Sequence, residues 1–261
     1  IRFAVDQARA ALGDFDGTVI VLYGDCPLIE SRTLEELCAT LSDSAVSVLG
    51  FEAKDPARYG RLITDGDKLK RIVEFKDASP AERAVSLCNS GVMAASAGLL
   101  FDLLSEIDAN NASGELYLTD VIGKAVARGL PCTAVRCAER ETLGVNSRVE
   151  LMQAEKEFQN LRRTEALEDG VTMPAPETVH FSYDTVIGRD TIIEQNVVFG
   201  PGVTVESGAQ IRAFSHLEGA HVSRGCIIGP YARLRPGAEL AEDVKIGNFV
   251  EIKASALEEG A

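Results

Sequence analysis

Two different periods of apolar residues divide this chain into a first half of alternating strands and helices and a second half of short repeats. In the first half, apolar runs of strand length alternate with segments whose apolar residues recur at helical spacing. We expect strands at 18–23, 45–53, 61–74, 86–96 and 131–137, and helices at 30–41, 98–107 and 118–129. The segment 61–74 is expected to form two strands around a turn at Asp65-Gly66-Asp67. This alternation predicts an α/β fold with a largely parallel sheet and ligands at the carboxyl ends of its strands.

A long helix is predicted between the two halves. Residues 147–168 contain no Pro or Gly and carry an apolar stripe among charged residues. Gly170 follows, and then Pro174 and Pro176, which cannot continue a helix. The sequence therefore predicts a linker helix that leads into a second structural unit.

The second half repeats with a period of six residues. Aliphatic or aromatic residues recur at 187, 193, 199, 205, 211 and 217, and the same register resumes at 222, 228, 234, 240, 246 and 252 after the loss of one residue. Four residues after most of these positions stands a small or β-branched residue, with His221 as the exception. Period six is typical of a parallel β-helix in which three hexads form one coil, so twelve hexads predict about four coils.

Composition narrows the class of protein. A net charge of −14 and a pI near 4.7 argue against a nucleic-acid-binding protein, which needs a basic surface. The six cysteines are scattered singly and only three histidines are present, so a zinc site is not favoured. The chain has no long apolar run, and residues 1–17 are typical of an amphipathic helix rather than a signal peptide. We therefore expect a soluble cytoplasmic protein without a membrane partner.

One strand ending suggests chemistry. The apolar run 18–23 stops at Gly24-Asp25-Cys26-Pro27, which places a carboxylate at the carboxyl end of a predicted strand. Asp25 is either a metal or ligand contact at the sheet edge or a turn-forming residue before Pro27. The pattern by itself leaves both interpretations open.

Six motifs, in this order, carry a resemblance to a known family. They are LYGDCPLI (22–29), YGRLI (59–63), IVEFKDA (72–78), CNSGVM (88–93), GELYLTD (114–120) and GVNSR (144–148). With the long helix and the hexad repeats, the chain resembles the bifunctional bacterial N-acetylglucosamine-1-phosphate uridyltransferase/glucosamine-1-phosphate acetyltransferases. The resemblance implies a Rossmann-like nucleotidyltransferase domain at 1–148, a linker helix at 149–170 and a left-handed β-helix acyltransferase domain at 171–261. It also implies a homotrimer formed through the β-helix.

The same resemblance implies two transferase reactions that supply UDP-N-acetylglucosamine for the cell envelope. One is Mg²⁺-dependent uridylyl transfer from UTP to N-acetylglucosamine 1-phosphate with release of pyrophosphate. The other is acetyl transfer from acetyl-CoA to glucosamine 1-phosphate. A hard cation such as Mg²⁺ prefers oxygen ligands and keeps several waters, so one carboxylate and one amide suffice from the protein.

The resemblance implies a set of site residues, and most of them could have a structural role instead. Asp25 and Asn146 match the metal ligands, although Asn146 could instead cap the long helix. The family's sugar-contacting positions match Gly60, Glu74 and Asn89. The alternative is that they are a turn glycine, a solvated glutamate at a strand edge and a turn asparagine. Tyr23 and Gly24 match the nucleotide side, which they would line with backbone atoms.

Two further matches lie in the repeats. Arg235 and Lys253 are eighteen residues apart, which places them on neighbouring coils, and they match positions that bind the acetyl acceptor's phosphate. The alternative is a pair of solvated corner charges. His180, His216 and His221 do not match the family's catalytic base, so no catalytic residue is assigned.

The resemblance also predicts what the chain lacks. The family's nucleotide-binding Gly-rich loop would precede residue 1, and its acetyltransferase His and a nearby Tyr would follow residue 261. We therefore expect an internal fragment that is inactive by itself in both reactions.

Two other functions remain open at this stage. One is a monofunctional sugar-1-phosphate nucleotidyltransferase with a hexapeptide tail, such as an ADP-glucose pyrophosphorylase. The other is a non-catalytic subunit of the same architecture. GVNSR directly before the long helix favours the bifunctional enzyme over the first, and the presence of Asp25 and Asn146 counts against the second.

Overall fold

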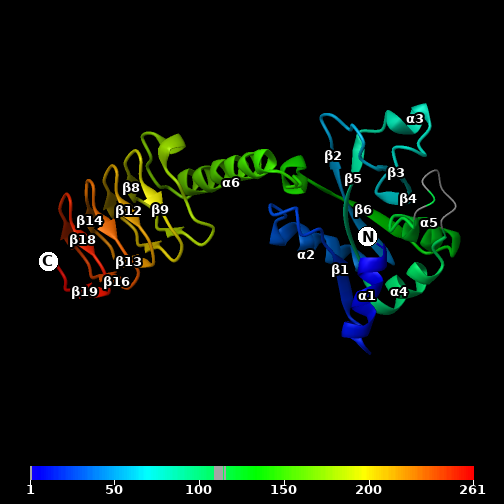
Figure 1. The fold of residues 1–261 in the computed structure, drawn as a ribbon, viewed down its shortest axis with the longest axis horizontal. Helices are drawn as coiled ribbons and strands as arrows, with labels where there is room; N and C mark the ends of the chain where they lie inside the picture. The colour runs from blue at the N-terminus through cyan, green and yellow to red at the C-terminus, as the bar shows by residue number, and fades with distance from the viewer. Residues whose placement is uncertain (1, 109–113, 115) are drawn as a thin grey trace. The chain divides into compact units, whose positions relative to one another are not determined.

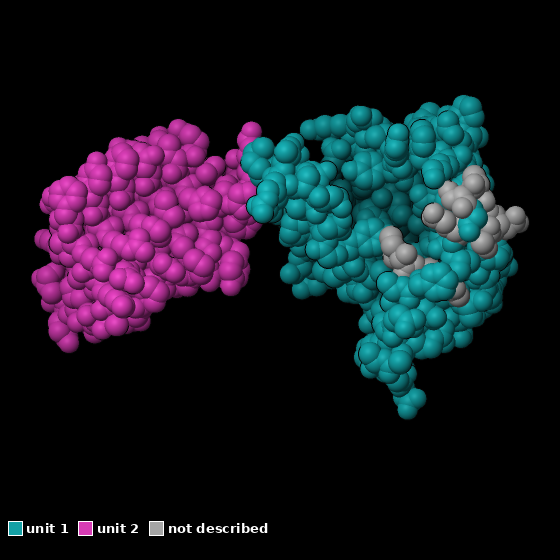
Figure 2. Space-filling view, viewed as in Figure 1, with its two compact units in different colours: residues 1–154 teal, residues 155–261 magenta. Residues whose placement is uncertain are grey.

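The computed structural model describes residues 2–108, 114 and 116–261, which form two compact units (Figure 2). The first unit covers residues 1–154 and the second covers 155–261. Glu115 of the GELYLTD motif lies outside the described residues. Among the described helices, none combines the length and apolar character that crossing a membrane requires.

The first unit is an α/β fold whose elements follow the predicted order (Figure 1). Its helices are α1 (Arg2–Leu12), α2 (Ser31–Ala39), α3 (Pro80–Arg83), α4 (Ala97–Ser105), α5 (Asp120–Ala127) and the start of α6 (Arg148–Glu168). Its strands are β1 (Thr18–Val21), β2 (Val46–Glu52), β3 (Arg61–Asp65), β4 (Lys68–Val73), β5 (Leu87–Ser96) and β6 (Cys132–Cys137). The hairpin between β3 and β4 turns at Gly66, whose φ of 60° favours glycine. Every predicted strand and helix of this half is confirmed, whereas the short α3 and a 3-10 turn at Glu139–Thr142 were not anticipated.

The sheet is mixed, with strand order β1-β5-β2-β6-β4-β3. Strands β1, β2, β6 and β3 share one direction, whereas β5 and β4 run against it. Only β2 and β6 are parallel neighbours among the named pairs. Four of the six described strands are therefore parallel to one another, as predicted. However, the antiparallel strands β5 and β4 lie between most of these four, so the sheet is mixed and not largely parallel.

Both faces of the central strands are covered by helices. Val46, Val48 and Met93 belong to an apolar cluster with residues of α4 and α5. Leu49, Val92 and Ala94 point to the other face and pack with Leu37 of α2. Because neighbouring residues of a strand face opposite sides and both sides are covered, strands β2 and β5 are buried along most of their length.

The second unit is a β-solenoid of short parallel strands that continues from α6 (Figure 1). The first sheet stacks β7 (Val186–Ile187), β10 (Thr204–Val205), β13 (Ala220–Val222), β16 (Ala238–Leu240) and β19 (Ser255–Leu257). The second stacks β8 (Ile192–Ile193), β11 (Gln210–Ile211), β14 (Ile227–Ile228) and β17 (Lys245–Ile246). The third stacks β9 (Val198–Phe199), β12 (His216–Leu217), β15 (Arg233–Leu234) and β18 (Glu251–Ile252).

The period-six positions form the core of this solenoid. Ten of the twelve are buried, and Ile187 and Ile252 at the two ends are partly buried and pack against the same cluster. Coil neighbours are eighteen residues apart, as in Val186 and Thr204, except at two places where the spacing is seventeen: across the break, where Thr204 pairs with His221, and in the last coil, where Ala238 pairs with Ser255. A missing residue therefore shortens a coil without breaking the stack.

This packing predicts a large difference between two adjacent isoleucines of β8. Ile193 is fully buried, whereas 40% of Ile192 is exposed. Ile193→Ala is expected to lower the unfolding free energy of the second unit by about 2–5 kcal/mol, because it leaves a cavity in the core. Ile192→Ala, the matched control, should lower it by less than about 1 kcal/mol. Native-state hydrogen exchange of the amides of β11 measures both values, and equal losses would contradict the assignment of the inward face.

Candidate functional site

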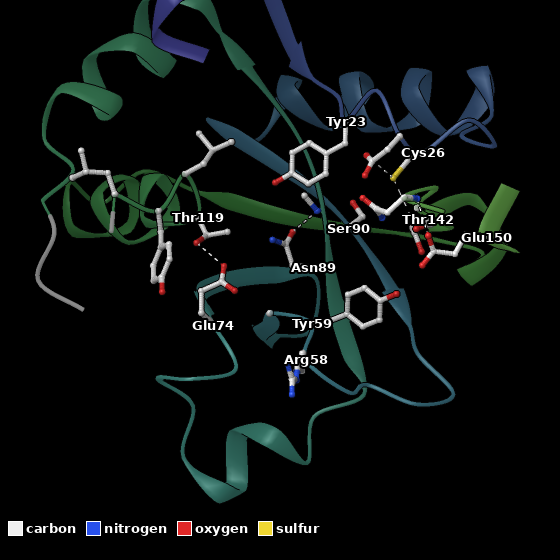
Figure 3. Close-up of a pocket in the computed structure, with 18 residues that line it drawn as sticks. Tyr23, Cys26, Arg58, Tyr59, Glu74, Asn89, Ser90, Thr119, Thr142 and Glu150 are labelled. Carbon is white, nitrogen blue, oxygen red and sulfur yellow. Dashed lines mark hydrogen bonds between the residues drawn. The ribbon is translucent and has the colours of Figure 1, made fainter. Parts of the chain in front are cut away.

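A cavity of about 590 Å³ opens in the first unit, where segments far apart in the sequence meet (Figure 3). Six of the seven residues predicted for the uridyltransferase site line it: Tyr23, Asp25, Gly60, Glu74, Asn89 and Asn146. Gly24 is not among the lining residues, and a Cβ added to it would meet no atom within 4 Å. The role expected for Gly24 therefore stays a prediction.

Asp25 and Asn146 lie together at one end of the cavity. The Val145 N–H donates to the carbonyl oxygen of Asp25 at 2.8 Å, which joins the segment before α6 to the end of β1. A Cβ added to Gly144 would lie 3.7 Å from Asn146 Nδ2 and 3.8 Å from Asp25 Oδ2. Both side chains therefore border the same small volume.

The capping of α6 is provided by Ser147 rather than by Asn146. The Ser147 hydroxyl accepts a hydrogen bond from the Glu150 N–H at 3.2 Å, and Glu150 Oε2 accepts from the Asn146 N–H at 2.7 Å. This reciprocal arrangement satisfies two amides at the helix start. The side-chain amide of Asn146 is not needed for the cap, which leaves it to face the cavity.

The side chains beside Gly144 fit a hard divalent cation when the Asn146 amide turns its oxygen, in place of the Nδ2 that lies nearest Gly144, toward Asp25. A carboxylate and an amide oxygen are the ligands that Mg²⁺ accepts while it keeps several waters. Among the described residues, no cluster of three or more His, Cys, Asp or Glu side chains could hold a metal ion. A soft or fully protein-caged ion therefore does not fit the described part of this unit, whereas a partly hydrated one does.

Gly60, Glu74 and Asn89 meet at another part of the cavity. A Cβ added to Gly60 would lie 3.4 Å from Glu74 Oε2 and 3.6 Å from Asn89 Cβ. The Asn89 N–H donates to the Gly60 carbonyl at 2.8 Å, and Asn89 Oδ1 accepts from the Gly91 N–H at 3.0 Å. The Asn89 oxygen already accepts one of the two hydrogen bonds that it can take, and the NH₂ group can donate to a ligand.

Tyr23 lines the cavity with its ring, not only with backbone atoms as expected. A Cβ on Gly91, whose φ is 86°, would collide with this ring, so residue 91 must be glycine for both reasons. Burial raises the pKa of the Tyr23 phenol, and the nearby carboxylates of Glu74 and Asp25 raise it further. The phenol therefore stays a neutral hydrogen-bonding group at neutral pH.

A buried arginine holds the loop that carries Tyr59 and Gly60. Arg61 is almost fully buried, and its guanidinium donates to the carbonyls of Pro56, Ala57 and Arg83 at 3.2–3.4 Å, and also to that of Tyr59. Phe75 packs near the guanidinium, 6.0 Å from ring centroid to Cζ. These bonds fix the loop against the last residue of α3, Arg83.

Sequence reasoning missed several residues that line the cavity. The principal ones are Cys26, Arg58, Tyr59, Tyr117, Thr119 and Glu150. Thr119 and Tyr117 belong to the GELYLTD motif, which indicated the family but did not reveal a role for either side chain. Arg58 stands before Tyr59-Gly60 with no local pattern to mark it. Of the charged residues described as lining the cavity, three are carboxylates and one, Arg58, is a cation.

Arg235 and Lys253 occupy neighbouring coils of the solenoid, as predicted. Strands β15 and β18 pair Leu234 with Ile252, and the Arg235 N–H donates to the Ile252 carbonyl at 2.9 Å. Arg235 Nη1 also donates to Glu251 Oε1 at 3.1 Å, whereas Lys253 is exposed. The described structure therefore places the two cations one coil apart, with an acidic side chain beside Arg235.

The electrostatics of the cavity predict how the pKa of Tyr23 changes when a neighbouring charge is removed. Glu74→Gln removes a negative charge that raises the pKa of Tyr23, so that pKa is expected to fall toward the ordinary value of 10.0. Glu139→Gln is the matched control, because Glu139 raises the pKa of Tyr59 and not that of Tyr23. ¹³C NMR of Cζ-labelled tyrosines across alkaline pH measures both. An unchanged Tyr23 pKa in Glu74→Gln would show that this carboxylate does not act on the phenol.

Comparison with known proteins gives matches to both halves of the chain. Residues 184–219 match the family described as "Bacterial transferase hexapeptide (six repeats)". The "Bifunctional protein GlmU" of Roseobacter denitrificans is 62% identical over 257 residues, which cover 98% of this chain and 57% of that protein. The protein of the same name from Ruegeria sp. is 63% identical over 258 residues, or 99% of this chain and 58% of that protein.

Solved structures are similar at much lower sequence identity, and one of them serves as an example. The nucleoside-diphosphate-sugar pyrophosphorylase of Vibrio cholerae is 15% identical, with a TM-score of 0.42 over 57% of this chain and 60% of that one, which is too low to support an argument. The curated relatives, in contrast, align with nearly the whole of both units at 62–63% identity. The chain is similar to the bifunctional GlmU proteins over nearly its whole length and spans about 57% of theirs.

Proposed function

We propose that the first unit serves uridylyl transfer from UTP to N-acetylglucosamine 1-phosphate, with release of pyrophosphate. The observation that carries this proposal is the convergence of Asp25, Gly60, Glu74, Asn89 and Asn146 on one cavity, although they span more than a hundred residues of sequence. The similarity to bifunctional GlmU proteins supports it.

The sugar is bound at Gly60, Glu74 and Asn89. Glu74 Oε2 accepts a hydrogen bond from a sugar hydroxyl, and the Asn89 NH₂ group donates to an oxygen of the sugar or its N-acetyl group. Gly60 leaves room between them, since a Cβ there would contact both side chains. The three residues thus orient the sugar phosphate toward the end of the cavity that holds Asp25.

Asp25 and Asn146 would hold a magnesium ion through their side-chain oxygens. When bound, Mg²⁺ offsets the charges of the two phosphate-bearing substrates and of the developing transition state. In the reaction, an oxygen of the sugar phosphate attacks the α-phosphorus of UTP, and the bond to pyrophosphate breaks. Pyrophosphate leaves with the electron pair of that bond, so the chain's residues need only orient the two anions in line.

For the second unit we propose a part in acetyl transfer from acetyl-CoA to glucosamine 1-phosphate. Arg235 and Lys253 bind the acceptor's phosphate from neighbouring coils, as two cations at one edge of the solenoid. A left-handed solenoid assembled as a homotrimer, in the cytoplasm, belongs to the same proposal. The two reactions together supply UDP-N-acetylglucosamine for peptidoglycan and lipopolysaccharide.

The proposal predicts that Asp25 separates the two activities. In the complete gene product, Asp25→Ala is expected to reduce Mg²⁺-dependent uridylyl transfer by about 10²–10⁴-fold, because a metal ligand is lost. Acetyl transfer should stay within about twofold, since the substitution lies in the other unit. Both rates are measured with the purified substrates, and Asp14→Ala on the exposed loop before β1 serves as the charge-matched control. Equal loss of both activities would show that Asp25 has a structural role only.

A further inference from the structure

Thr119 directs its hydroxyl across the cavity rather than to its own helix. Helix α5 begins at Asp120, so Thr119 occupies the N-cap position, where a Thr oxygen ordinarily accepts a hydrogen bond from the first turn. No such capping bond is present in α5. Instead, Thr119 Oγ1 donates to Glu74 Oε1 at 3.0 Å, over a separation of 45 residues (Figure 3). A tertiary contact at the cavity has replaced a local one.

This contact fixes a side chain that would otherwise be mobile. Glu74 follows β4 directly, and its backbone is held by a turn in which the Asp77 N–H donates to the Glu74 carbonyl at 3.0 Å. The glutamate side chain retains three rotatable bonds, and restricting them on ligand binding lowers affinity. Because Thr119 is only 7% exposed, its hydroxyl is a rigid donor that orders the carboxylate before a ligand arrives.

The second oxygen of Glu74 is left for a ligand. Oε2 lies 3.4 Å from a Cβ built on Gly60, and Glu74 itself lines the cavity. Among the described residues, only Thr119 donates a side-chain hydrogen bond to this carboxylate. An ionised carboxylate accepts hydrogen bonds at both oxygens, so Oε2 is satisfied by a donor on the bound molecule.

We propose that Thr119 is a positioning residue that sets the affinity and selectivity of the sugar end of the cavity. By holding Oε1 of Glu74, it aims Oε2 at one hydroxyl of the sugar phosphate. The inference rests on the proposed function, because that function supplies the sugar phosphate. A sugar phosphate that lacks this hydroxyl is discriminated against, since it would cover the half-buried Glu74 carboxylate and leave Oε2 unpaired.

The first test compares the change in KM for the sugar phosphate with the change in KM for UTP. In the complete gene product, Thr119→Val keeps the side-chain shape and removes the hydrogen-bond donor to Glu74. The KM for N-acetylglucosamine 1-phosphate should therefore rise about 10-fold or more, as expected for a lost hydrogen bond to a charged group. The KM for UTP should stay within about twofold, and Thr119→Ser should restore the first KM. Equal increases in both KM values, or no rescue by serine, would overturn the inference. If the valine variant does not fold, Thr119→Ala carries the same test.

The second test asks whether Thr119 acts through Glu74. In a double-mutant cycle with Glu74→Ala, adding Thr119→Val should change the KM for the sugar phosphate by less than about twofold. Additive effects would mean that Thr119 contacts the substrate itself, which overturns a positioning role.

The two proposals fail in distinguishable ways. If the unmodified gene product shows no uridylyl transfer, the proposed function falls and this inference falls with it. If transfer is present and Glu74→Ala raises the sugar-phosphate KM while Thr119→Val does not, only the inference is overturned.

Discussion

Strand β5 is the constraint on which the first unit depends, because it forms hydrogen bonds with three other strands. It pairs with β1 on one side, with β2 on the other, and with β3 at Cys88. The same strand carries Asn89, whose N–H binds the Gly60 carbonyl, and Gly91, which accommodates the ring of Tyr23. The part of the cavity that Gly60 and Asn89 line therefore forms only when β5 has inserted between β1 and β2.

The charge of the cavity means that the anionic substrates we propose need a cation in order to bind there. The described lining holds the carboxylates of Asp25, Glu74 and Glu150 against one guanidinium, that of Arg58. Two phosphate-bearing substrates would be repelled by this surface in the absence of a cation. An ion held between Asp25 and Asn146 would reverse the local sign at the reacting end, while Glu74 remains a hydrogen-bond acceptor at the other end. The whole-chain charge of −14 thus says little about this local chemistry.

The two units differ in how directly their sequences reveal them. Each coil of the solenoid repeats the contacts of the coil before it, so one inward position, such as Ile193, predicts the next at Ile211 and Ile228. Even the shortened coil is visible as a one-residue break in the period. The first unit has no such repetition, and each of its contacts is made once between segments that the sequence does not mark as partners.

The sequence by itself determined the elements and the inward face of the solenoid, because burial imposes a local period on the order of apolar and polar residues along the chain. It also indicated the family and six residues of the cavity through motifs. It did not determine that β5 runs antiparallel between β1 and β2, since strand order depends on contacts between distant segments. Nor did it show that Ser147 caps α6 in place of Asn146, or that Thr119 binds Glu74. Those pairings were decided by tertiary structure, because a polar side chain takes whichever partner the fold brings within hydrogen-bonding distance.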